Sequence, residues 1–124
     1  IGCHTKTHHR MVASTPKNQL QSEIRVSKRI LEEKLGHTVV IFCWVGGEEL
    51  SYSGQGAQTI REATYKYSFM TNCMPITIHT NPLQLQRNNV ETSWPINLVK
   101  FALSGVMDLL YMPKRKRVNK LTSK

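Results

Sequence analysis

The chain has few acidic residues, few cysteines and no long apolar run, and each shortage excludes something. Its 124 residues contain eight acidic side chains and a single aspartate, Asp108, so aspartate can supply at most one ligand to a metal site. The three cysteines are widely separated and form no Cys-x-x-Cys pair, which argues against a disulfide framework and a thiolate zinc site. No apolar run is long enough to cross a membrane, so we expect no transmembrane segment.

Positive charge is plentiful but unevenly distributed. The net charge is +9 at pH 7, and residues 114–124 hold six basic residues and no acidic one. The remaining residues carry only +3. Terminal charge runs are usually solvated and unstructured, so we predict a basic, disordered tail over residues 113–124. Because no nucleic-acid-binding motif accompanies the charge, we expect no nucleic-acid partner, and a basic nucleic-acid binder is the weakest alternative.

The residue pattern alternates between helix and strand. A helix is expected to begin at Ser14-Thr15-Pro16 and to end at Gly36, because proline suits a first helical turn and glycine a helix end. The other expected elements are a buried strand over 38–45 ended by Gly46-Gly47, a helix over 55–66, strands over 67–71 and 76–78, and a helix that starts after Pro95 and runs to about residue 110.

This order predicts an α/β fold in which parallel strands alternate with helices through right-handed crossovers. The chain has the length of one domain or part of one, and because it starts with Ile1 rather than methionine, we expect it to be a fragment.

Active-site groups in parallel sheets gather at the carboxyl ends of strands. That rule selects residues 44–49, residues 72–74 and the histidine-rich run at the start of the chain.

His4 and His8 are the strongest candidates for metal ligands. Two imidazoles four residues apart can face one divalent cation if the backbone between them is helical or tightly turned. Catalytic zinc normally takes three protein ligands, so a third must come from elsewhere. Asp108 is a poor candidate because it lies within the expected C-terminal helix.

Several motifs, taken together, resemble one known family. The histidine run fits a motif of histidine, serine or threonine, two variable residues and histidine, and the later segments follow in the family's order. The chain therefore resembles the polysaccharide deacetylase family, the NodB-homology domain of carbohydrate esterases. The segments that carry the resemblance are Gly2 to His8, Gln21 to Gly36, Phe42 to Gly47, Tyr52-Ser53, Ile60 to Ala63 and Tyr65 to Thr71.

The resemblance implies that residues 1–112 are the C-terminal part of a deformed (β/α) barrel that binds a divalent metal, commonly zinc. It implies His4 and His8 as metal ligands, with an aspartate pair on a strand before them, upstream of Ile1. In the family the metal polarises an acetyl carbonyl and activates water, an aspartate acts as base and a later histidine protonates the leaving group. The implied function is hydrolytic deacetylation of an acetylated polysaccharide or amino sugar.

The chain also departs from the family pattern. His9 and Val45 stand where the family usually has proline, the third motif has no arginine, and His79 comes too early to match the late leucine-x-histidine motif. We therefore do not expect full catalysis by these 124 residues alone. The alternative is a catalytically inactive remnant or a glycan-binding module of the same fold.

Four further residues are predicted to contact an acetylated glycan. Thr5 would brace the metal loop through its hydroxyl group. Trp44 at a strand end offers an aromatic face for a sugar ring, although core packing explains it equally well. Gly46 lies in the turn after that strand, and Arg87 would orient an anionic substrate group or tie its loop to a backbone carbonyl. Glu48 and Glu49 are a weaker candidate for an acid–base pair.

Overall fold

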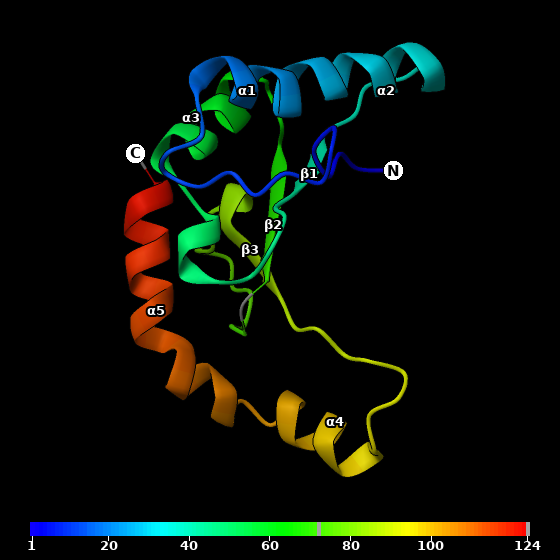
Figure 1. Cartoon of the computed structure of the whole chain (residues 1–124). Helices are drawn as coiled ribbons and strands as arrows, with labels where there is room; N and C mark the ends of the chain where they lie inside the picture. Colours follow the sequence, from blue (N-terminus) through cyan, green and yellow to red (C-terminus); the bar gives the residue numbers. More distant parts are fainter. Residues whose placement is uncertain (72, 124) are drawn as a thin grey trace.

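Three parallel strands form the centre of the chain, in a computed structural model that describes residues 1–71 and 73–123. The strands are β1 (Ile41–Cys43), β2 (Tyr67–Thr71) and β3 (Leu85–Arg87), and they lie side by side in that order (Figure 1). Phe42 pairs with Ser68 in the first register, and Met70 pairs with Gln86 in the second. The predicted α/β fold with parallel strands is therefore confirmed.

The N-terminal segment extends this sheet beyond β1. Cys3 forms a parallel bridge with Phe42, its N–H donates to the Ile41 carbonyl at 2.8 Å, and its own carbonyl accepts from the Cys43 N–H at 2.8 Å. Cys3 is fully buried. The residues that follow it, including His4, therefore lie at the same edge of the sheet as the end of β1.

One long helical rod precedes β1, as predicted. It consists of α1 (Lys17–Gln21), a π-helical turn η1 (Ser22–Val26) and α2 (Ser27–Leu35), and it lies across the top of the molecule in Figure 1. Gly36 ends the rod with φ of +69°, the left-handed conformation that glycine adopts without steric cost. The next helix, α3 (Gly54–Glu62), begins at Ser53, whose hydroxyl accepts from the Gly56 N–H. A short 3₁₀ turn, η2 (Glu49–Ser51), lies between β1 and α3.

The predicted strand over 76–78 is wrong. These residues belong to a loop in which Thr77 and Thr80 hydrogen-bond to each other and Ile78 is 95% exposed. The third strand is instead β3, which follows the 3₁₀ turn η3 (Pro82–Gln84). Two prolines, Pro75 and Pro82, bound the loop and cannot donate to a sheet ladder.

The predicted disordered tail is also wrong. The C-terminal helix divides at Gly105, with φ of +84°, into α4 (Ile96–Leu103) and α5 (Val106–Thr122). Residues 113–122 are helical and bury Arg115, Val118 and Thr122 against the body of the molecule. Basic residues predict a solvated tail only when no apolar face accompanies them. Lys124 lies outside the described residues.

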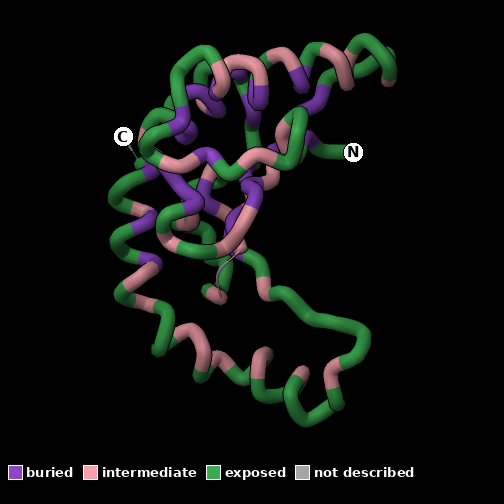
Figure 2. The backbone as a smooth tube through the Cα atoms, viewed as in Figure 1, coloured by how far each residue is buried: buried purple, intermediate pink, exposed green. Residues whose placement is uncertain are grey.

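The core lies between the sheet and the surrounding helices. Figure 2 shows buried residues in the upper body and at the C-terminal half of α5, whereas α4 projects away and has no buried residue. Fully buried apolar side chains from the rod, the sheet and α5 meet there: Leu20, Ile24, Phe42, Met70 and Val118. None of the described helices is both long and apolar enough to cross a membrane.

Candidate functional site

The structure brings the two predicted metal ligands together. The His4 and His8 rings have centroids 4.9 Å apart and cross at 68°. Nδ1 of His4 lies 2.9 Å from the Cys43 carbonyl oxygen. Because a carbonyl oxygen can only accept, Nδ1 carries the proton in the neutral ring and Nε2 keeps its lone pair. Both residues are exposed, so that lone pair is accessible to a cation.

A tight turn, not a helix, produces this pairing. Thr5 and His8 have φ of +64° and +59°, a left-handed conformation that is unusual for residues other than glycine and most costly for a β-branched one. Such a residue costs about 1–3 kcal/mol and persists only where its surroundings hold it. Part of that support comes from Thr5 itself, whose hydroxyl accepts from the His9 N–H at 3.2 Å.

Glu23 is the main support of the turn, and the sequence did not reveal it. Its carboxylate accepts from the N–H groups of Lys6 and Thr7, at 2.8 and 2.9 Å, and from the Thr7 hydroxyl at 2.7 Å. Glu23 is 3% exposed and lies in η1, the π-helical turn that interrupts the rod. Such turns often occur at functional sites. A carboxylate in a helix normally indicates a solvated position, so only tertiary structure identifies it.

The hydrogen bonds to Glu23 also keep it ionised. Burial alone would raise the pKa of this carboxyl group, but the hydrogen bonds from Thr7 and Lys6 outweigh burial and place the pKa below its usual range. A carboxylate with a lowered pKa stabilises the fold above its unfolded-state pKa. That contribution is lost as the pH falls through the folded-state pKa.

Glu23→Gln is therefore expected to destabilise the chain by about 1.5–3 kcal/mol at pH 7, because it removes a charged acceptor of three hydrogen bonds. The difference from wild type should shrink as the pH is lowered below about 4.3, the ordinary glutamate pKa. Urea unfolding of both proteins, at pH 7 and at a pH below about 4.3, measures this difference in the free energy of unfolding. Glu33→Gln is the matched control, because the Arg29–Glu33 ion pair is exposed and should matter little. An equal loss in the two variants at pH 7 would contradict the role of Glu23.

The loop after β1 lies next to the histidine turn. Arg10, just past that turn, forms an ion pair with Glu48 at 3.3 Å. The pKa of Glu48 falls to about 2, because its own N–H, the Ser51 hydroxyl, the Gly47 N–H and Arg10 all favour the carboxylate. Glu49 is bound in two places by Arg117, and this contact lowers its pKa too. Neither glutamate is suited to donate a proton near neutral pH, which argues against their weaker candidacy as an acid–base pair and favours the alternative of solvated carboxylates.

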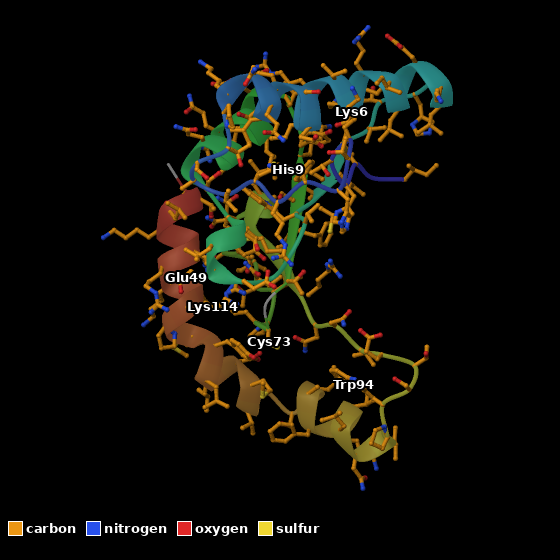
Figure 3. All side chains as sticks on the ribbon, in the orientation of Figure 1. Lys6, His9, Glu49, Cys73, Trp94 and Lys114 are labelled. Atoms are coloured by element: carbon orange, nitrogen blue, oxygen red, sulfur yellow. The ribbon has the colours of Figure 1, made fainter. Side chains whose placement is uncertain are left out.

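A cavity of about 280 Å³ opens at the carboxyl ends of the strands. Arg87, at the end of β3, lines it, and its guanidinium donates to the Cys43 sulfur at 3.4 Å. Cys43 thus contacts both Arg87 and His4. Figure 3 shows Cys73 and Lys114 on the strand-end side of the molecule and Trp94 on the projecting arm; all three line the cavity.

Trp44 does not offer a face to a sugar. It is 1% exposed, packs edge-on against Phe42 and Tyr52 and donates its indole N–H to the Ser68 hydroxyl at 2.9 Å. The prediction of a stacking platform is therefore wrong for this chain, and the alternative of core packing is confirmed. Later residues cover this strand end, because Tyr52, which precedes α3, packs against the Trp44 ring with centroids 5.2 Å apart.

Gly46 has a structural role that explains its identity. Its φ is +85°, and an added Cβ would lie 2.6 Å from the Ser51 hydroxyl oxygen. Only glycine fits this turn. A contact between substrate and Gly46, or between substrate and the half-buried Thr5, stays a prediction.

The histidine pair is an incomplete metal site by itself. Among residues 1–71 and 73–123, no group of three histidine, cysteine, aspartate or glutamate side chains is placed to hold one ion. The two imidazoles do have the right chemistry for zinc or a similar cation, since neutral imidazole is a common ligand and the His4 ring is oriented by a backbone carbonyl. Within the described residues, the pair could therefore offer a metal ion two ligands.

Comparisons with known proteins agree with this description. A family model described as polysaccharide deacetylase matches residues 1–68. A solved structure, the Streptococcus pyogenes deacetylase PplD in complex with acetate, is similar with a TM-score of 0.65 and 21% sequence identity; the match covers 80% of this chain and 42% of that one. The predicted partial (β/α) barrel is thereby confirmed. A search of curated proteins finds no match.

Proposed function

Because the chain belongs to the polysaccharide deacetylase family, we propose that it is the C-terminal part of a metal-dependent hydrolase that removes acetyl groups from a polysaccharide or amino sugar. The chain spans about two fifths of the length of the similar streptococcal deacetylase. The observation that carries the proposal is the exposed His4–His8 pair, with its rings 4.9 Å apart, in a turn whose left-handed residues are held by a buried carboxylate.

His4 and His8 would hold a divalent cation, and zinc is the expected ion. When bound, such a cation supplies Lewis-acid chemistry: it polarises a carbonyl and lowers the pKa of water. The third ligand and the catalytic base are proposed to come from a segment upstream of Ile1, as in the family that the sequence resembles. Residues of this chain hold the two imidazoles in place, and the Cys43 carbonyl fixes the His4 tautomer.

The cavity at the strand ends is the proposed binding site for the glycan. It lies at the same carboxyl end of β1 as His4, because Cys43, the last residue of β1, contacts both His4 and the cavity residue Arg87. Arg87 and Lys114 would donate hydrogen bonds to sugar hydroxyl or carboxylate oxygens. The acetate in the similar streptococcal structure is the product that this reaction would release.

The proposal predicts that acetate release depends on both histidines and on a metal ion. The assay measures acetate released from a chitin oligosaccharide by the full-length protein that contains this chain. We expect activity to be lost on treatment with a chelator and restored by Zn²⁺ or Co²⁺. His4→Ala and His8→Ala should each lower kcat/KM by at least about 1,000-fold, because the cation stabilises the transition state by several kcal/mol.

Two results would count against the proposal. Full activity in the chelated protein would exclude metal dependence, and full activity in His8→Ala would exclude the ligand assignment. His37→Ala is the control, because His37 is exposed beyond the helix end at Gly36. Binding of the oligosaccharide without acetate release would favour the alternative, an inactive or glycan-binding module.

A further inference from the structure

Arg115 is a buried cation without a hydrogen-bond partner among residues 1–71 and 73–123. It lies in α5 and is 1% exposed, and its Nε, Nη1 and Nη2 atoms make no hydrogen bond within the described part of the chain. Burial lowers its pKa to about 10, and nearby Tyr52, Cys73 and Asp108 partly oppose that effect. Arg115 is therefore still charged at pH 7. Asp108 acts on it only at longer range and forms no hydrogen bond with it. A buried charge without a paired counter-charge is costly, so this guanidinium is suited to bind an anion.

Arg115 lines a cavity of about 350 Å³. The cavity lies between the loop over residues 74–81, strand β3 with the turn before it, and α5, and no acidic side chain lines it. Its size is in the range of pockets that hold small ligands. The other polar residues that line the cavity are Thr77, His79, Thr80, Asn81, Gln84, Gln86 and Asn119.

Two hydrogen-bond acceptors in the same cavity also have no partner in the described part of the chain. They are Oε1 of Gln86 and Oδ1 of Asn119. The Gln86 amide nitrogen donates to the Gln84 carbonyl at 2.9 Å, so the orientation of this side chain is fixed with its oxygen free. A ligand that fits must therefore present an anionic acceptor to Arg115 and hydroxyl donors to Gln86 and Asn119. Water could satisfy the two amide oxygens, but it carries no charge to balance Arg115.

We propose that this cavity is a binding site for a small hydroxylated oxyanion, namely the carboxylate or phosphate group of an acidic sugar. A guanidinium binds both groups in the same way, through two parallel N–H···O bonds. Neighbouring sugar hydroxyls would donate to Gln86 and Asn119. The proposal rests on Arg115 and its cavity, and it does not depend on metal binding at His4 and His8.

Calorimetric titration of the chain in 150 mM NaCl tests the proposal. The probes are glucuronate, glucose 6-phosphate, inorganic phosphate and neutral glucose. We expect one or both acidic sugars to bind, more tightly than inorganic phosphate, and glucose not to bind. Whichever acidic sugar binds better identifies the carboxylate or the phosphate as the natural group. Arg115→Met should weaken binding of that sugar by about 10-fold or more, because it removes a charge-assisted hydrogen bond.

Lys116→Met is the matched control, because Lys116 is the neighbouring residue on the same helix and is exposed. It removes the same charge and should leave binding unchanged. If Arg115→Met does not fold, as judged by circular dichroism, Asn119→Leu takes its place, since the Asn119 side-chain oxygen has no partner to lose. Equal affinity in wild type and Arg115→Met, or in wild type and Asn119→Leu, would overturn the proposal. So would an equal loss in Lys116→Met, or no binding of either acidic sugar.

Discussion

Replacing both His4 and His8 by alanine is expected to lower the affinity of the chain for zinc by at least about 100-fold, or about 2.7 kcal/mol. The two rings are adjacent, with centroids 4.9 Å apart, and the His4 ring is oriented by its hydrogen bond to the Cys43 carbonyl. Loss of an orienting partner alone typically costs 10–100-fold in metal affinity, so loss of both ligands should cost more.

Zinc titration by calorimetry measures this difference, and the fold should be unaffected because both side chains are exposed. The matched control is the double variant His37→Ala with His79→Ala, which removes two exposed histidines from other parts of the chain. It should bind zinc as wild type does. Unchanged zinc affinity in the His4 and His8 double variant would end the ligand assignment.

Val118→Asp is expected to destabilise the chain by more than about 4 kcal/mol, which is much of the stability of a typical domain. Val118 is fully buried and belongs to the core cluster together with residues of the sheet and the rod. A carboxylate at this position would be buried without a partner. We therefore expect the midpoint of urea unfolding to fall sharply, or the variant to be unfolded in water.

Leu121→Asp is the control for this prediction. Leu121 lies in the same helix but is 44% exposed, so the same kind of substitution should cost far less. If residues 113–124 were a disordered tail, both substitutions would be neutral. Equal unfolding midpoints in the two variants would therefore contradict the packing of α5 against the core.

Local sequence signals were sufficient for the elements that they specify directly. The rod over residues 17–35 ends at Gly36 as predicted, and β2 has the predicted limits, Tyr67–Thr71. The spacing of His4 and His8 identified the histidine pair, although the backbone between them is a turn with left-handed residues. For the helix end and β2, the residues that determine the structure lie within one short stretch of sequence, whereas the histidine turn also depends on the distant Glu23.

The features that the sequence did not reveal depend on burial, which is a property of the tertiary structure. The strand β3 has only three residues, and its central residue is the polar but buried Gln86, so no apolar pattern marks it. Glu23 and Arg115 are charged residues in helices, which normally indicates a solvated face, yet both are buried. Trp44 lies at a strand end but is buried against Tyr52 from the segment that follows.

The most direct test of the account is whether His4, through Nε2, and His8, through one of its ring nitrogens, bind one cation. Titration of the ¹⁵N-histidine-labelled chain with Zn²⁺, followed by NMR of the ring nitrogens, measures this. We predict that the Nε2 signal of His4 and a ring-nitrogen signal of His8 change together and saturate at one equivalent, while the ring-nitrogen signals of His37 and His79 stay unchanged. Separate saturation of the two rings, or no change in either, would contradict the metal site from which the proposed deacetylase function follows.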